Sequence, residues 1–531
     1  MLRFPPTAAT IQESIDARTK LIHRLELKVR NLDLERQRPT QEWYKLAAER
    51  EALRTLLLPS HRLPAEILSQ IFVAVHHANW RDSRQVNALC RVCKLWRNIA
   101  IGTHQLWSNL ELGYSHVYKC KIHNISRWFE RSGSLPRRLI LGGLYGRCST
   151  DHATGSDCHM VEKTAVATLL TQGPTLDTLN LQEIPPDCFQ ELAKHMKEHQ
   201  TPLVIRPWDS LKSLTISVSL RHLQDPPPLK QFLLHLPSVP SLHLSGLYHE
   251  EEQIQLLPTH PSVLGNLTTL SLRHLPLLCI LALLPLCKNL EDLTLSPMDF
   301  YENTTANIAH YLVHLPSVRV LRLNHLAYET VAALPKLLRT PALVDLSVSF
   351  ENGDDFNSPL DSDEDDEEEK PVTDHRTEMV TGLVSFIQQS KATVRRLLLR
   401  KLKISSRGLE RLLSYMPSVT DLVLISVTMV NTLFRPVKYV APDVKYHVQL
   451  LPRLYSLRLC YMPDHFPYEE VCDFFIHRAT SSPNIGRLKV LRLETDPETA
   501  EGYDSITWGD LRRAVLKLSR LGVDAFVCSA Y

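Results

Sequence analysis

The sequence contains no long apolar run and no segment typical of export. Its longest apolar stretch, from Leu275 to Cys287, is shorter than the roughly 18 residues that a membrane-spanning helix requires, and prolines interrupt it. The first residues show no apolar segment after a basic residue, so the pattern of a secretory signal is missing. We therefore expect a protein of the cytoplasm or nucleus that has no membrane partner.

Motifs of common enzyme classes are also missing, since neither a Gly-rich phosphate loop nor Gly-x-Ser-x-Gly nor His-Glu-x-x-His occurs. The 11 cysteines are irregularly spaced, which fits buried thiols better than a disulfide framework. Cys90 and Cys93 form a Cys-x-x-Cys, a spacing found in zinc sites. A second group of zinc-ligand residue types comprises Cys148, His152, Cys158 and His159. Because the first pair falls in an amphipathic helical pattern, where this spacing is typical of core packing, we expect no metal site. Because no enzyme motif occurs, we also expect no cofactor and no catalytic residue.

A repeat fills most of the chain. From residue 176 onward an aliphatic residue, two variable residues and then Leu-x-Leu, or a close variant of it, recur at steps that are often 25 or 28 residues. This is a leucine-rich-repeat period. Each Leu-x-Leu predicts a short strand with alternate side chains buried, and the segment before it predicts an outer helix that ends at a proline. The prediction for residues 113–531 is thus an α/β fold, a curved leucine-rich-repeat solenoid closed by a helix and a last strand within 508–528.

The turns after these strands differ from the common form of the repeat. Three residues after the second leucine, where an asparagine often bonds the turn backbone, the chain has an apolar residue. The positions are Ile184, Leu247, Leu275, Met298, Leu326, Leu402, Val427 and Met462. We expect turns that are held by packing, with no asparagine ladder.

Residues 1–57 show helical periodicity. Ile15, Ile22, Leu25, Val29 and Leu32 form one apolar stripe, with arginines at 18 and 36 where a heptad would place apolar residues. Pro39 predicts a break, after which Thr40 would cap a second helix. The segment is either a helical hairpin or a short coiled coil that dimerises.

Residues 58–112 start a separate pattern at a proline. The stretches "LPAEILSQIF" and "LCRVCKLWRNIAIGTHQLW" resemble the F-box. The order of helical segment, F-box and leucine-rich repeats is similar to that of F-box proteins from mushroom-forming (basidiomycete) fungi. In that family the F-box docks on the Skp adaptor of a cullin-RING ubiquitin ligase, while the repeats hold the protein substrate. The resemblance therefore implies a non-catalytic substrate receptor.

The resemblance also implies a set of adaptor-binding residues. They are Leu63, Pro64, Ile67, Leu68, Ile71, Val92, Cys93, Trp96 and Ile99. A segment of roughly 50 residues is too small to bury all of these aliphatic side chains internally, so some should await a partner. Two alternatives stay open, in which the segment only caps the first repeat: a scaffold without ubiquitin transfer, or a regulator of an enzyme.

Outward-facing positions of the repeat strands change character along the chain, from small and polar in the early repeats to basic and apolar in the later ones. The candidate substrate-binding residues are Arg322, Arg396, Leu398, Arg400, Val423, Ile425, Arg458 and Arg492. This mixture is typical of a binding patch for an acidic or phosphorylated protein, although a simple solvated face has the same composition. Nucleic acid is disfavoured because few aromatic residues lie between the arginines.

One insertion is strongly acidic. Residues 351–370 contain 11 acidic residues and one lysine, so we expect residues 351–376 to be extended and disordered. Because the insertion lies next to the basic repeats in sequence, we expect it to compete with the substrate for these arginines.

Overall fold

The computed structural model describes residues 8–57, 63–78, 83–113, 122–142, 165–184, 206–218, 236–246, 261–297, 312–326, 328–350, 375–428, 451–462, 468–481, 488–495 and 505–529, with a few single residues between 189 and 198 and residue 466. The chain divides into two compact units, Met1–Leu106 and Trp107–Tyr531. Of the residues expected to form the acidic insertion, only 375 and 376 are described, and they begin a helix. The residues Cys148, His152, Cys158 and His159 also lie outside the described part.

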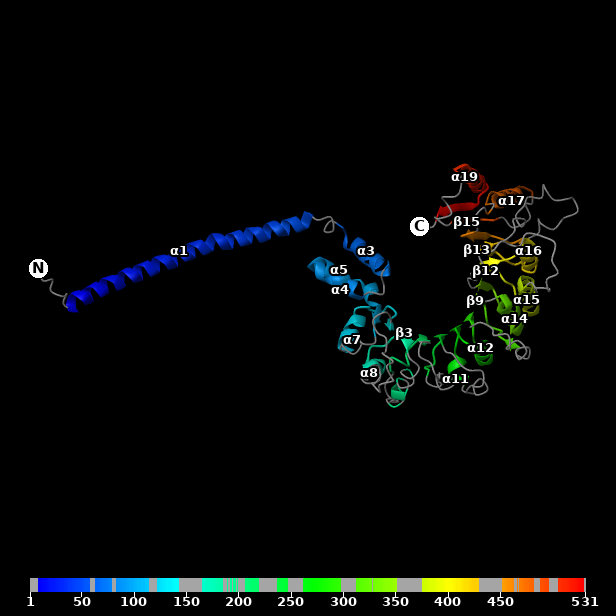
Figure 1. Ribbon diagram of the computed structural model, residues 1–531, viewed down its shortest axis with the longest axis horizontal. Coiled ribbons are helices and arrows are strands. Elements are labelled where there is room, and N and C mark those ends of the chain that lie inside the picture. The colour runs from blue at the N-terminus through cyan, green and yellow to red at the C-terminus, as the bar shows by residue number, and fades with distance from the viewer. Residues whose placement is uncertain are drawn as a thin grey trace, which may run out of the picture. The chain divides into compact units, whose positions relative to one another are not determined.

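The first unit begins with one continuous helix, α1 (Ala8–Leu57), of 50 residues (Figure 1). The expected hairpin is therefore wrong, because the helix runs through Pro39. A proline inside a helix removes one backbone hydrogen bond and crowds the preceding turn, and a helix can absorb this by bending instead of ending. Among the side chains described in α1, only Ala47 is even half-buried, and the others are exposed.

Three short helices follow α1: α3 (Ala65–Ala78), α4 (Ser83–Val92) and α5 (Lys94–Gly102). They pack on one another around Phe72, whose ring lies 4.9 Å from that of Trp96 between centroids. Leu68, Val86 and Ala100 are also buried. The single turn η1 (His104–Trp107) comes next in the chain.

The second unit is built on an open sheet of 14 strands. Every neighbouring pair in it is parallel, and the strands follow one another in sequence order from β1 at one edge to β16 at the other. The strands are β1 (Asn109–Leu112), β2 (Arg138–Leu141), β3 (Thr178–Ile184), β4 (Ser213–Val218), β5 (Ser241–Ser245), β6 (Thr269–Arg273), β7 (Asp292–Ser296), β9 (Val320–Leu326), β11 (Asp345–Phe350), β12 (Arg396–Lys403), β13 (Asp421–Thr428), β14 (Ser456–Cys460), β15 (Val490–Thr495) and β16 (Asp524–Ser529). All the Leu-x-Leu segments expected to be strands are strands.

Aliphatic residues align across the sheet. Leu397 of β12 stands in register with Leu346 on one side and Leu422 on the other, and the row continues through the leucines of the other repeats. A second row two residues on includes Leu399 and Leu424, and all five side chains are at most 1% exposed. The alternation of buried and half-exposed positions along β4 and β5 is what a strand with one covered face produces.

Helices cover the face with the buried leucines. The second unit contains α7 (Ile122–Glu130), α8 (Ala165–Gln172), α11 (Pro261–Leu264), α12 (Leu277–Leu283), η5 (Leu284–Leu286), α14 (Tyr328–Leu337), α15 (His375–Ser390), α16 (Ser406–Ser414), α17 (Tyr468–Ser481) and α19 (Ser505–Arg520). Figure 1 shows α12, α14, α15, α16 and α17 along the same side of the sheet. The strand face on the other side carries the residues between the leucines.

Two expected helix ends, each shortly before a proline, are strands. Val313 and His314, before Pro316, form β8 (Val313–His314), which pairs in parallel with β10 (Leu338–Arg339) of the next repeat. Proline still stops the element, but the residues before it bond to the neighbouring repeat. The helix side of the sheet therefore has a small second sheet of its own.

The turns are packed, as the sequence predicts. In several repeats the second residue after the last leucine has a left-handed backbone and φ of 50–56°: Glu183, His274, His325, Lys401, Ser426 and Tyr461. The next residue in each of these turns is an apolar one named above and is buried, with 6% exposure at most. Gly246 takes the same position after β5 with φ 78°, where an added Cβ would meet the carbonyl oxygen of Val218. The left-handed residue turns the chain so that the apolar side chain points into the core.

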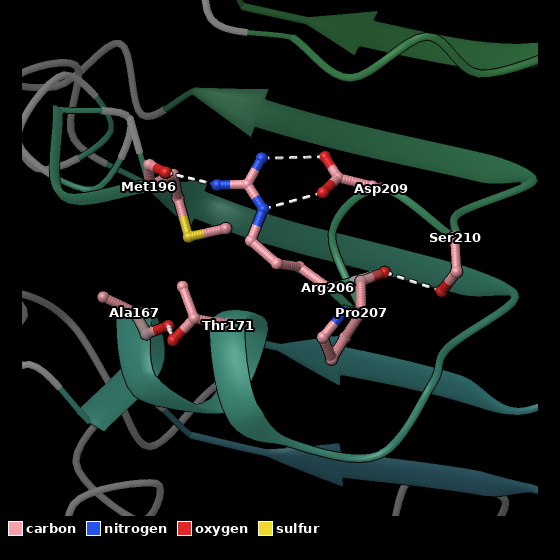
Figure 2. A network of polar contacts seen from close by, with 7 residues as sticks. All are labelled: Ala167, Thr171, Met196, Arg206, Pro207, Asp209 and Ser210. Atoms are coloured by element: carbon pink, nitrogen blue, oxygen red, sulfur yellow. Dashed lines mark hydrogen bonds and ion pairs between the residues drawn. The ribbon is translucent and has the colours of Figure 1, made fainter. Parts of the chain in front are cut away.

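A polar network fixes the chain before β4 (Figure 2). The guanidinium of Arg206 donates to both carboxylate oxygens of Asp209, at 2.7 and 2.9 Å, and to the backbone oxygen of Met196. The hydroxyl of Ser210 donates to the carbonyl of Pro207 at 2.9 Å. Arg206 is only 6% exposed, so its charge is balanced inside the fold by Asp209 and the carbonyl.

Among the helices that the structure describes, none combines the length and the apolar character that crossing a lipid bilayer requires.

Candidate protein-binding surfaces

Helix α3 carries two apolar stripes with opposite environments. Leu68 and Phe72, spaced by four residues, are 2% and 1% exposed. Ile67, Ile71 and Val75 have the same spacing one residue away and are 41%, 42% and 44% exposed. Residues four apart lie on one face of a helix, so the first stripe faces the core and the second faces solvent.

The Leu-Pro pair lies at the start of this helix. Pro64 is exposed and its carbonyl accepts the backbone N–H of Leu68 at 3.1 Å, which closes the first helical turn. Leu63 is 39% exposed and continues the spacing of Ile67 and Ile71 toward the N-terminus. We define the exposed stripe as the four residues Leu63, Ile67, Ile71 and Val75, which are spaced by four along the chain.

The expected residues around α5 have different environments. Val92 is 60% exposed at the end of α4, whereas Cys93, Trp96 and Ile99 are half-buried. The Sγ of Cys93 accepts the backbone N–H of Trp96 at 3.4 Å and so caps α5. Trp96 packs on Phe72. Cys93 and Trp96 therefore hold α3 and α5 in place as well as presenting part of their surface.

Leu68 is the one expected adaptor-binding residue that the structure places in the core. Three exposed aliphatic residues were not among those expected: Val75, Leu95 and Ile101. For Val75 a signal was present, because it extends the spacing of Ile67 and Ile71 by another four residues. For Leu95 and Ile101 the spacing of apolar residues in the sequence does not show whether the side chain is exposed or buried.

The second candidate surface is the strand face of β9 to β16. In register across it lie the middle residues of the Leu-x-Leu strands, first Arg322, Ser347 and Leu398, then Val423, Arg458 and Arg492. Phe526 of β16 ends this row and is 48% exposed. In the next row toward the carboxyl ends, Arg400 pairs with Ile425. The structure therefore brings the expected residues of β12 to β15 together, with an apolar centre between arginines.

Two of the five expected arginines are already neutralised by neighbouring strands. The Nη1 of Arg322 lies 2.6 Å from a carboxylate oxygen of Asp292, and that of Arg396 lies 3.3 Å from one of Asp345. Within the described part of the chain no ion pair joins Arg400, Arg458 or Arg492 to a carboxylate. Neighbouring strands are roughly 4.8 Å apart, so Arg458 and Arg492 place two positive charges close together.

A carboxylate lies at the border of this pair. Cys460 stands in register with Glu494. Burial, together with the hydrogen bond to Glu494 and its negative charge, raises the pKa of the Cys460 thiol to about 12 even though Arg458 opposes the shift. The thiol is therefore neutral at physiological pH, and Glu494 limits the positive potential on that side of the arginines.

The early strands present a face of another kind. Thr178, Ser213 and Ser241 are half-buried, and the hydroxyls of the two serines lie 3.4 Å apart. His243 lies 3.3 Å from the Ser241 hydroxyl, and burial and the charge of Arg273 lower its pKa despite the opposing charge of Asp292. This part of the face is neutral and small, which leaves the later strands as the basic and apolar part.

The cysteine pair has a structural explanation. Cys93 caps α5, and the carbonyl of Cys90 accepts the Nε–H of Arg97 at 2.8 Å. In the portion of the chain with described placement, no three histidine, cysteine or acidic side chains are close enough together to hold a metal ion.

Comparisons with known proteins bear on the first surface. No curated protein matches the chain. A protein-family model does match one segment, which contains α3, α4, α5, η1 and β1. The F-box resemblance drawn from the sequence is thereby confirmed for this segment: residues 60–112 match the family described as F-box-like.

Proposed function

We propose that this protein is the substrate-recognition subunit of a Skp-cullin-F-box ubiquitin ligase. The F-box-like segment fits a role as an adaptor for Skp-type complexes. In this proposal the exposed stripe of α3 docks on the Skp adaptor, and the second unit, a leucine-rich-repeat solenoid, binds a protein substrate. No catalytic group is needed, because the receptor raises the substrate's effective concentration at the conjugating enzyme.

The observation that carries the proposal is the exposed stripe beside the buried one on α3. Its four aliphatic side chains are 39–44% exposed. Exposed apolar surface is unfavourable in water, and α3 already packs on the core through its other face, so the stripe is best explained as a contact surface for a partner. A segment that only capped the sheet would be expected to present a polar outer face. An apolar groove on a partner would bury the stripe at the helical spacing of four residues.

A pair of variants tests the docking. Ile71→Asp places a charge in the stripe. Gln70→Asp places the same charge on the preceding residue, which is exposed and polar. We expect Ile71→Asp to weaken co-purification with the Skp adaptor at least tenfold, because charged groups are costly in a desolvated apolar contact. Gln70→Asp should retain wild-type binding, and both variants should keep the wild-type circular dichroism.

Failure of the intact chain to bind any Skp adaptor would overturn the proposal. It would leave the F-box-like segment as a structural cap and the sheet as a scaffold or an enzyme regulator. Equal loss in both variants would show that the adaptor does not use the exposed stripe.

For the substrate we propose an acidic or phosphorylated protein segment. Support comes from Arg400, Arg458 and Arg492 around the apolar Leu398 and Val423 on the strand face. Arginine forms strong charge-assisted hydrogen bonds with carboxylate and phosphate groups, and an apolar centre supplies buried area. This surface lies in the second unit and is independent of the adaptor-binding stripe.

A further inference from the structure

The continuity of α1 through Pro39 joins two apolar segments into one heptad register. Counting Ile15 as position a, later a positions include Ile22, Val29 and Trp43, and the d positions include Leu25, Leu32 and Leu46. We call these seven residues the seam. If the helix ended at Pro39, Trp43 and Leu46 would start an unrelated face. In the continuous helix they extend the first stripe.

Among the described residues of the first unit, none covers the seam. Its side chains are 51–64% exposed, although they are among the largest apolar residues of the first unit. A helix without tertiary packing has little to stabilise it in water, where helical stability in proteins comes mostly from burying an apolar face. A second α1 would cover the seam along about 46 Å, the distance from Ile15 to Leu46 at 1.5 Å per residue.

Charges beside the seam select the occupant and its direction. In two parallel in-register helices, a residue at g lies near the residue five positions later on the other helix, at e. This spacing joins Lys28 to Asp33, both exposed on α1, and in sequence it joins Glu49 to Arg54. Between Ser14 and Arg54 no such pair brings together two like charges.

We propose that α1 forms a parallel two-stranded coiled coil with the α1 of a second copy of this chain. In the opposite direction, with Ile15 beside Leu46 of the other copy, the attraction of Lys28 and Glu35 would be opposed by the repulsion of Glu26 and Asp33, whereas the parallel register has no such repulsion between g and e. A seam at 3.5 residues per turn drifts by about 20° per heptad on a straight helix, so the two helices supercoil to keep it buried.

Arginines in the register explain why the pattern is easy to miss. Arg18 and Pro39 fall at d, and Arg36 and Arg50 fall at a. A basic residue at such a position lowers the stability of a coiled coil but fixes its register, and its long side chain can carry the charge out to solvent. The dimer places two receptors in one assembly, which strengthens binding to a substrate with two recognition segments.

The mass of the full chain in solution tests the proposal. We expect sedimentation equilibrium to give twice the 60.7 kDa of one chain. Leu25→Asp, at a seam position, should weaken the dimer at least tenfold. Leu27→Asp is the matched control, because Leu27 is similarly exposed, at 48% against 53%, but lies at f, away from the seam. A wild-type chain of 60.7 kDa at all concentrations, or equal dissociation in both variants, would overturn the proposal.

Cross-linking tests the direction independently of stability. The natural sequence has no cysteine before Cys90, so a cysteine can be placed in α1. In a parallel dimer Ile15→Cys lies beside its own copy and should form a disulfide-linked dimer on mild oxidation, while Glu13→Cys, at f, should not. In an antiparallel dimer residue 15 lies 31 residues from its copy, about 46 Å along the axis, so absence of the Ile15→Cys cross-link would overturn the parallel arrangement.

Discussion

The first and second units treat the same kind of residue in opposite ways. On α3, Ile67 and Ile71 are about two-fifths exposed, whereas in the sheet the corresponding leucines of β12 and β13 are at most 1% exposed. Both sets are aliphatic residues at the regular spacing of their element. What differs is the neighbour. The leucines of β12 and β13 stand between matching aliphatic residues on two other strands, whereas no described residue of the first unit covers the α3 stripe.

The comparison shows a different kind of surface on each unit. The sheet encloses its leucines and leaves charged residues such as Arg458 half-exposed on its strand face, whereas α3 exposes an apolar stripe. Under the proposed function the two surfaces would bind two partners of different chemistry, so that one partner's surface does not attract the other.

The largest expected effect comes from removing a leucine that the sheet encloses. Leu424→Ala on β13 removes a side chain with 0% exposure and leaves a cavity between two strands and the covering helices. We expect a loss of about 2–5 kcal/mol in the free energy of unfolding. Ile71→Ala on α3 should cost below about 1 kcal/mol, because its side chain is already in contact with water.

Urea denaturation of both variants of the full chain gives this comparison. An equal cost for Ile71→Ala and Leu424→Ala would mean that the α3 stripe is packed within the protein. The stripe would then be unavailable to an adaptor, and the contrast between the two units would fail.

Most of the sheet could be predicted from the sequence. The Leu-x-Leu repeat places the eleven strands of the large sheet from β3 to β15, because alternation of two leucines around one residue is a local pattern that needs no knowledge of the neighbours, whereas β1 and β2 precede the first repeat assigned from the sequence. The apolar residues after the strands, such as Ile184 and Leu402, correctly predict packed turns. The left-handed residues before them, Glu183 and Lys401, could not be predicted, because neither is a glycine and their backbone is set by the packing.

The failures of prediction concern context. Pro39 has the local signal of a helix end, yet the helix continues, and only this continuity reveals the seam register. Leu68 and Ile67 are adjacent and chemically alike, so sequence alone did not assign one to the core and the other to the surface. The ion pairs of Arg322 and Arg396 depend on strand register between repeats, which separates the free from the neutralised arginines.

A smaller effect, on the binding of an acidic peptide, should distinguish arginines that form an ion pair among the described residues from those that do not. The probe is a synthetic peptide of residues 358–370 of this chain, added to the chain with residues 351–370 deleted. Arg458→Gln should weaken peptide binding about tenfold, since it removes a charge-assisted hydrogen bond at an unpaired arginine. Arg322→Gln should weaken it less, because Asp292 already holds that side chain.

Titration calorimetry at low and high salt measures both variants. We also expect the intact chain to bind the added peptide more weakly than the deleted one, because its own acidic residues compete, and all binding should weaken with salt. Equal effects of Arg458→Gln and Arg322→Gln, or equal binding to the intact and deleted chains, would contradict the role assigned to these arginines and to the insertion.

The smallest effect concerns a polar contact at the strand starts. Asp177 accepts the backbone N–H of Arg137 at 2.9 Å and lies 2.7 Å from the ammonium of Lys212, so it links the chain segments before β2, β3 and β4. Burial alone would raise the pKa of the Asp177 carboxyl. The hydrogen bonds from Lys212 and Arg137 and the two positive charges outweigh burial, and the pKa lies below its usual 3.8.

A lowered pKa in the folded state gives the sign of the pH dependence. The ionised carboxylate contributes to folding stability at any pH above the ordinary pKa of an aspartate, and this contribution is lost as the pH falls through the lower folded value. Asp177→Asn should therefore cost below about 1 kcal/mol at pH 7, because the contact is partly exposed and screened by water. The difference from wild type in urea midpoints should shrink as the pH falls below 3.8. A difference that grew instead would contradict a stabilising role for the ionised Asp177 carboxylate, because protonation would then favour the wild type over Asp177→Asn.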